Sequence, residues 1–108
     1  MGAFNTLETE LACPSCGELA IIPIQFKFGN CWQLKYTVGD VLTWGGNDVG
    51  NSGIARAVVD GQGESCPVCS SDSDFYIFVV HDQIDHVTAA TGEFKFDVPP
   101  ESYIVLET

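Results

Sequence analysis

Two short cysteine repeats constrain the fold of this chain more than any other feature of its sequence. Residues 13–17 read CPSCG and residues 66–70 read CPVCS. In each repeat a proline starts a tight turn, a small residue leaves it, and two residues separate the cysteines. Four thiolates from two such turns can surround one Zn²⁺ ion as a tetrahedron. We therefore predict a structural Cys₄ zinc-ribbon site formed by Cys13, Cys16, Cys66 and Cys69.

Other uses of the four cysteines are a redox dithiol, two disulfides, or an iron ion held by the same sulfur atoms. A thioredoxin-like dithiol would need a helix directly after the first cysteine and a βαβ frame, and the sequence indicates neither. Iron stays open, because tetrahedral sulfur ligation suits both zinc and iron. All four ligands would come from the protein, so the ion would have no open position for catalysis.

The separation of the two repeats is unusually long. Forty-nine residues lie between Cys16 and Cys66, whereas simple ribbons have roughly 15–20. Each doubling of a closed loop costs only about 0.6 kcal/mol. Zinc binding in small fingers supplies about 10–16 kcal/mol. A metal site can therefore tolerate a set of β-strands inserted between its two halves.

Charge restricts the partners that we expect. The chain has 108 residues, enough for one zinc-stapled β domain spanning 1–108, and a net charge of −11. Its four basic residues are scattered and form no footprint for phosphates, which argues against direct binding to nucleic acid or to an anionic membrane. Acidity favours a basic protein partner, although it can also serve solubility alone.

The start of the chain predicts a cytoplasmic protein. Residues 1–10 carry two glutamates and no Lys or Arg, which does not fit a secretory signal peptide. No window approaches the ~18 continuous apolar residues of a membrane helix. Five cysteines without a secretion signal suggest a reducing compartment, where cysteine pairs more often bind metal than form disulfides.

Alternating apolar residues predict an all-β fold, a compact antiparallel sheet or barrel-like domain. The runs 22–28 and 32–38 read as a hairpin turning at Gly29-Asn30, with Pro23 placing the first strand at an edge or a bulge. Residues 75–80 are apolar on both faces and predict a central strand, turning at Asp82-Gln83 into 84–90. Shorter strands are expected at 41–44, 54–59, 94–98 and 103–106, with a turn at 60–61. We expect no amphipathic helix.

The glycine-rich loop 45–53 is the first place to look for a working surface. Long loops in compact domains often bind partners, although a plain connection is the simpler interpretation. Carboxylates elsewhere could pair with Lys or Arg of a basic partner. The candidate partner-binding residues are Trp44, Asn47, Asp48, Asn51, Asp72, Asp74, Asp82 and Asp85.

Few other residues could carry chemistry. His81 and His86, each beside an aspartate, could serve a hydrolase or a second metal, but the expected hairpin separates them across the ladder. In that hairpin His81 faces Ile84 and His86 faces Val79. Cys31 is expected to be an incidental buried thiol. The aromatic side chains read as core residues and not as a base-stacking platform, because basic neighbours are absent.

Several segments of the N-terminal part resemble a known group of proteins. The chain begins MGAFNT, continues with CPSCG, and carries QFKF at 25–28 and YTVGD at 36–40. This combination, over roughly residues 1–45, resembles small bacterial and phage-associated zinc-ribbon proteins, which often begin MGxF and carry FQxK and YxVGD segments. The resemblance implies a small cytosolic β protein with a zinc knuckle and implies no established activity.

These features together favour a non-enzymatic, acidic zinc-ribbon module that binds a basic protein. An inhibitor or immunity protein that occludes its partner would fit, since such proteins are similar in size and charge. An alternative is a zinc-ribbon adaptor in nucleic-acid machinery, which at this charge would act through protein contacts. A hydrolase using His81 and His86 is a third alternative.

Overall fold

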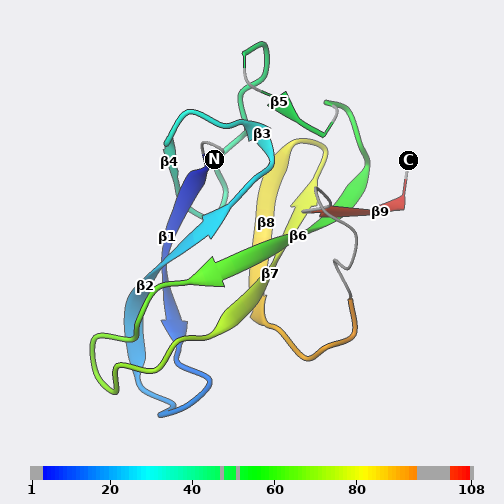
Figure 1. The fold of residues 1–108 in the computed structure, drawn as a ribbon. Coiled ribbons are helices and arrows are strands. Elements are labelled where there is room, and N and C mark those ends of the chain that lie inside the picture. Colours follow the sequence, from blue (N-terminus) through cyan, green and yellow to red (C-terminus); the bar gives the residue numbers. More distant parts are fainter. Residues whose placement is uncertain (1–3, 47, 51, 95–102, 108) are drawn as a thin grey trace.

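We describe the fold from a computed structural model, which places residues 4–46, 48–50, 52–94 and 103–107. These residues contain no helix, and so no helix that could cross a membrane. Their strands (Figure 1) are β1 (Asn5–Ala12), β2 (Leu19–Phe26), β3 (Gly29–Asn30), β4 (Lys35–Tyr36), β5 (Asp48–Val49), β6 (Arg56–Gly63), β7 (Asp74–Val80), β8 (Gln83–Ala89) and β9 (Tyr103–Glu107). The prediction of an all-β fold is confirmed.

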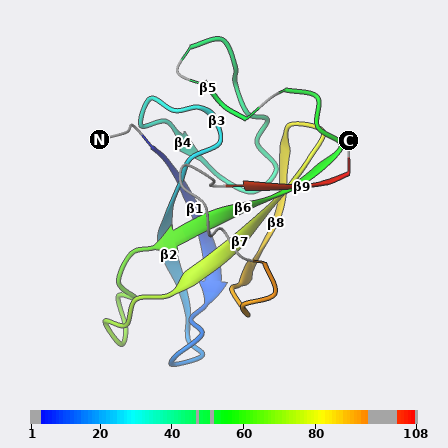
Figure 2. The ribbon, with the colours of Figure 1, turned by 45° about the vertical axis from the view of Figure 1, so that its right-hand side comes forward.

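The main sheet has the order β4-β1-β2-β6-β7-β8, and a small second sheet pairs β3 with β5. Strand β6 has different neighbours along one edge, because β9 pairs with its first half and β2 with its end. Figure 2 shows β9 and β2 beside these two parts of β6. Every pairing is antiparallel except that of β1 with β4.

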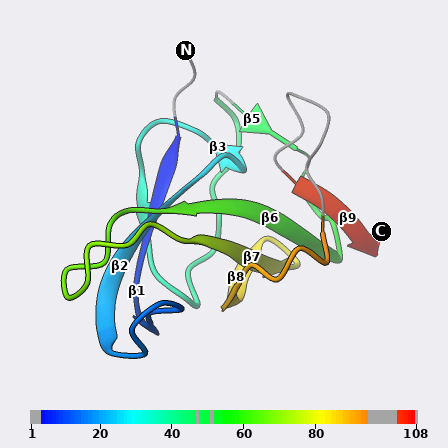
Figure 3. The same cartoon turned by 60° about the horizontal axis from the view of Figure 1, so that its bottom comes forward.

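The main sheet curls until its two edges are joined. Strands β1 and β2 run steeply across β6 and β7 (Figure 3). The segment after β4 then reaches β8: Gly39 N donates to Ile84 O (2.8 Å), Ile84 N donates to Asp40 O (2.9 Å), and Leu42 N donates to Asp82 O (2.7 Å). The expected barrel-like shape is therefore present. The radius of gyration of 13.2 Å matches the ~13 Å of a compact chain of this length.

The core fills the inside of this curled sheet. Side chains at alternate positions of the long strands point inward, as a half-buried strand requires. The fully buried apolar residues of this core include one from each of β1, β2, β6, β7 and β8: Leu7, Ile24, Val59, Ile77 and Ile84. The two metal-site halves join this cluster through Cys13 and Cys66, so the cysteine turns are anchored to the core.

The predicted hairpin of residues 22–28 with 32–38 is wrong. Strand β2 pairs instead with β1, over eight residues from Asn5↔Phe26 to Ala12↔Leu19. The run 32–38 supplies only the two residues of β4, parallel to β1. The cause is Asn5, whose fully buried side chain bonds Phe28 O, Asn30 O and Leu34 N and so holds the intervening chain as a loop.

The predicted turn at 60–61 is also wrong, because β6 runs on to Gly63. Gly61 is needed for close packing and not for a turn: a Cβ there would lie 2.7 Å from Ile24 Cγ2 and 3.1 Å from Phe75 O. Pro23 lies inside the sheet, opposite Glu8, where the β2–β6 pairing ends. Its carbonyl accepts from Glu64 N (2.8 Å) on the β6 side, and its missing N–H faces that side too.

The prediction of a central strand at 75–80 is confirmed by β7, which lies between β6 and β8. The β7–β8 turn falls at His81-Asp82, one residue earlier than expected, with φ values of 49° and 66°. The run 41–44 forms only a single bridge, Val41↔Gln83. Strand β9 covers the expected 103–106, whereas most of the expected strand 94–98 lies outside the described residues.

Candidate metal centre

The two cysteine turns lie at the same end of the sheet. The first turn connects β1 to β2 and the second connects β6 to β7. Because β2 pairs with the end of β6, the two loops lie side by side at the lower end of the sheet in Figures 1 and 2. The sheet register therefore brings together residues that are about fifty positions apart in sequence.

The two turns have the same backbone hydrogen bonds. In each, the residue after the second cysteine donates to the carbonyl of the first, and the first cysteine donates to the carbonyl one residue beyond. The bonds are Gly17 N to Cys13 O (2.8 Å), Cys13 N to Glu18 O (3.0 Å), Ser70 N to Cys66 O (2.8 Å) and Cys66 N to Ser71 O (3.0 Å). Gly17 and Ser70 leave the turns at φ values of 77° and 62°, a conformation that favours small residues.

The four sulfur atoms form one cluster. Cys13 Sγ lies 3.7 Å from Cys69 Sγ, and Cys16 Sγ lies 3.9 Å from Cys66 Sγ. All four are within 4.8 Å of one another. A tetrahedral ion with metal–sulfur bonds of about 2.3 Å requires sulfur separations of about 3.8 Å, whereas a disulfide brings two sulfurs to about 2.05 Å. The residues fit a tetrahedral ion and not a pair of disulfides.

Local hydrogen-bond donors favour ionisation of two of these thiols, Cys13 and Cys69. The N–H groups of Cys16 and of the residue before it lower the pKa of the Cys13 thiol. The hydroxyl and N–H of Ser71 lower the pKa of Cys69 to about 6. The N–H of Glu18 lowers the pKa of Cys16, but burial and the other three thiols raise it to about 12. Four thiolates so close repel one another, so their full ionisation requires a cation among them.

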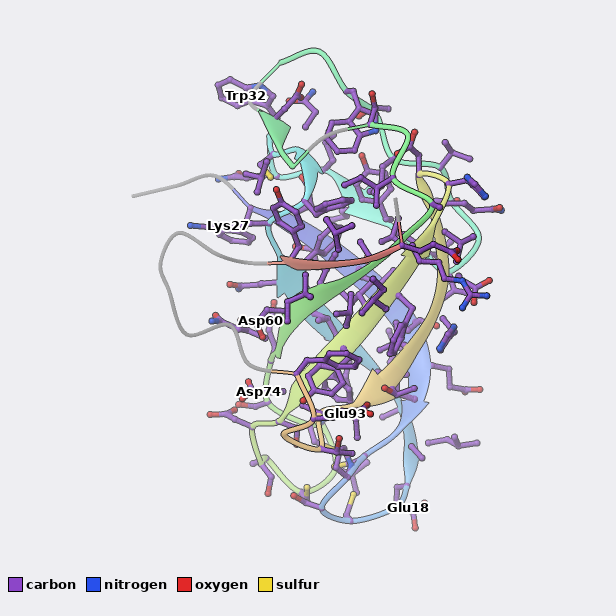
Figure 4. The ribbon with its side chains drawn as sticks, turned by 90° about the vertical axis from the view of Figure 1, so that its right-hand side faces the viewer. Glu18, Lys27, Trp32, Asp60, Asp74 and Glu93 are labelled. Atoms are coloured by element: carbon purple, nitrogen blue, oxygen red, sulfur yellow. The ribbon has the colours of Figure 1, made fainter. Side chains whose placement is uncertain are left out.

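The cluster bridges core and surface. Cys13 and Cys66 are buried, Cys69 is half-buried and Cys16 is exposed. Figure 4 shows sulfur atoms in yellow at the end of the molecule marked by Glu18. In the described part of the chain this is the one group of at least three potential metal ligands. An ion here would tie the β1–β2 hairpin to the β6–β7 hairpin.

Three of the predicted partner-binding residues, in or near the glycine-rich loop, contact other residues of this chain. Asp48 accepts hydrogen bonds from Gly45 N and Gly46 N, and Asp82 accepts one from Gly53 N. Trp44 is half-buried, and its ring meets the Phe28 ring edge to face with the centroids 5.5 Å apart. Its Nε1 is buried and has no hydrogen-bond partner in the described structure. Asn47 and Asn51 lie outside the described residues.

The other predicted carboxylates lie elsewhere on the molecule. Asp72, beside the second cysteine turn, accepts a hydrogen bond from Ser65 Oγ at 2.7 Å. Asp85 pairs with His86 on β8, with Oδ2 and Nδ1 2.6 Å apart. Asp74 begins β7. The six candidates that the structure describes therefore do not converge on one surface.

The two histidines also stay apart, as the sequence predicts, although the expected pairing differs. His81 is in the β7–β8 turn, and a bulge between Phe78 and Val79 places His86 opposite Phe78, on whose ring it stacks at 4.4 Å. No contact in the described structure joins the imidazoles. Cys31 is a buried thiol, 1% exposed, as expected. Burial raises its pKa.

A pocket of about 420 Å³ near the first cysteine turn was not predicted from the sequence. It is lined by Pro14, Asp60, Ser73, Asp74, Tyr76, Ala89, Ala90, Gly92 and Phe94. The signal was the alternation in β6, which places Asp60 on the face opposite the core residue Val59. Because residues 60–61 were interpreted as a turn, Asp60 was not assigned to a strand face.

Comparison of the chain with protein-family models, with curated proteins and with solved structures gives no match.

Proposed function

We propose that the four cysteines hold one structural Zn²⁺ ion, and that the zinc-stapled domain binds a basic protein through its acidic surface. The sulfur separations of 3.7 and 3.9 Å support a tetrahedral ion. Zinc is the usual ion of such Cys₄ sites with paired CxxC turns, and iron is the alternative. The ion has four protein ligands and no vacancy for substrate, so its role is to hold two hairpins together.

The observation that carries the binding proposal is uncompensated negative charge. The net charge is −11, and four ionised cysteines on one Zn²⁺ would add about −2. Within the described ranges, the ion pairs are Arg56 with Glu107 and His86 with Asp85. Most of the carboxylates that the structure describes therefore form no ion pair, and a partner rich in Lys and Arg would supply the cations.

The mechanism we propose is occlusion. The acidic surface attracts a basic partner at long range and speeds encounter at low salt. Once docked, the rigid domain covers the partner's basic surface, as an inhibitor or immunity protein does. The resemblance of the N-terminal part to phage-associated zinc-ribbon proteins remains a prediction and names no partner.

Affinity capture from an extract of the organism that encodes the chain tests this function. The bait is the metal-loaded protein, washed at low ionic strength and again at about 0.15 M salt. We expect a basic protein at low salt, in smaller amount at higher salt, and direct binding when both proteins are purified. Recovery of only neutral or acidic proteins would overturn the proposal. A nucleic-acid-processing assembly bound through an acidic subunit would favour the adaptor alternative.

A further inference from the structure

The pocket beside the first cysteine turn combines carboxylates with aromatic rings. Asp60 on β6 is opposite Tyr76 on β7, and Asp74 is two residues before Tyr76. Since side chains alternate along a strand, all three project from the outer face of the β6–β7 pair, away from the core. Figure 4 shows Asp60 and Asp74 on the same side of the molecule as Glu93. Pro14, in the first cysteine turn, also lines the pocket.

The aromatic part of the pocket is already fixed in place. The Tyr76 hydroxyl accepts from Gly92 N (2.8 Å) and Phe94 N (3.1 Å) and donates to Phe94 O (3.2 Å). The rings of Tyr76 and Phe94 meet edge to face with centroids 5.1 Å apart. A preformed pocket loses little conformational entropy when a ligand enters.

Within the described part of the chain, the two carboxylates of the pocket are not neutralised. In the described structure neither Asp60 nor Asp74 has an ion pair or a side-chain hydrogen bond. Burial and the charge of Asp74 raise the pKa of Asp60. The ionised form of this pair is therefore destabilised, and a cation between the two carboxylates would stabilise it. Two carboxylates fall short of the oxygen ligands that Ca²⁺ requires, whereas aromatic rings suit an organic cation.

We propose that this pocket receives a single Lys or Arg side chain of the basic partner. The cationic group lies between Asp60 and Asp74, and its aliphatic stem packs along Tyr76, Phe94 and Ala89. A volume of about 420 Å³ is sufficient for one long side chain. This inference rests on the proposed function and makes the pocket the specific anchor within a generally acidic surface.

Titration with a hexalysine peptide, followed by amide NMR shifts and calorimetry, tests the pocket. The variant Asp60→Asn/Asp74→Asn removes both pocket charges without changing side-chain size. The matched control Glu8→Gln/Glu10→Gln removes two charges from exposed positions on β1. Hexaglutamine serves as the uncharged peptide. Circular dichroism and metal content establish that each variant is folded.

We expect the wild-type protein to bind hexalysine, with shifts at Ala90 and Gly92, and to ignore hexaglutamine. The pocket variant should lose about tenfold in affinity, since each partly exposed ion pair supplies up to about fivefold, and the β1 control less than about twofold. Equal losses in the two variants would overturn the pocket while leaving the basic-partner function intact. Failure of the wild-type protein to bind hexalysine would overturn both.

Discussion

Loss of the ion from the cysteine cluster should remove a large part of the stability of this protein. Cys16 and Cys66 are 50 residues apart in sequence, so the ion closes a long loop. A cross-link across a loop of this length reduces the entropy of the unfolded chain by an amount worth about 4 kcal/mol at 25 °C. Total stabilities of small domains are only about 5–15 kcal/mol. Metal removal should therefore lower the melting temperature by roughly 15–30 °C.

The assay compares Cys66→Ser, a chelator-treated sample and the control Cys31→Ser by thermal circular dichroism, with metal content measured on each. The Cys31 thiol lies outside the cluster and points its sulfur at Gly29 O, 3.4 Å away, where a serine hydroxyl can also donate. We expect Cys31→Ser to keep its metal and most of its stability. If Cys66→Ser or the chelated protein lost its metal but melted within a few degrees of the wild type, the ion would not be the staple we infer.

Three further variants test the packing and the charges. Asn5→Ala should cost about 2–5 kcal/mol in denaturant unfolding, because three bonded backbone groups lose their buried partner; an unchanged midpoint would contradict this. Gly63→Ala should cost about 1–3 kcal/mol, because a Cβ would lie 2.5 Å from Phe75 Cε2 and 2.7 Å from Ser73 O; a neutral result would show that β6 and β7 can separate freely. Asp60→Asn should stabilise the protein at neutral pH. The pKa of Asp60 is raised in the folded state, so its ionised form destabilises the fold above that pKa, and this destabilisation disappears as pH falls to the ordinary value of 3.8. A gain in the unfolding midpoint of Asp60→Asn that persisted at pH 3 would contradict this assignment.

The cysteine site could be predicted from sequence because its rules are local. A CPxC turn fixes its own backbone hydrogen bonds, whatever follows it, and the cost of the long gap rises only slowly with length. The small residue after each second cysteine, Gly17 or Ser70, is in the positive-φ conformation that the turn requires. Which strands would bring the two turns together could not be predicted, since β2 and β6 pair at only two positions.

The strand pairing could not be predicted because it depends on contacts between distant residues. Alternation identified β2, and a run apolar on both faces identified β7. Strand β1, with Thr6, Glu8 and Glu10 on its open face and Thr9 between its two leucines, gave too weak a pattern. No local sequence pattern around Asn5 indicates that its side chain is buried and hydrogen-bonded to the backbone of Leu34. Gly61 was ambiguous in the same way, because a glycine that permits close packing looks like one that permits a turn.

The pocket could not be predicted because it depends on how far β6 extends and on which strands pair with one another. Extending β6 past Gly61 is what places Asp60 opposite Tyr76 on the outer face. Its lining also includes Ala89, the last residue of β8, and Ala90, Gly92 and Phe94 after it. A sequence pattern contains the charges and the rings but not their common position, which only the sheet register provides.

X-ray absorption at the zinc edge of the purified protein tests the central claim most directly. Two pairs of the sulfur atoms stand 3.7 and 3.9 Å apart, close to the separation in a tetrahedral site, and all four lie within 4.8 Å of one another. We predict one equivalent of zinc with four sulfur neighbours at about 2.3 Å and no nitrogen or oxygen in the first shell. A first shell containing oxygen or nitrogen, or a metal-free protein with the cysteines oxidised to each other, would contradict the account.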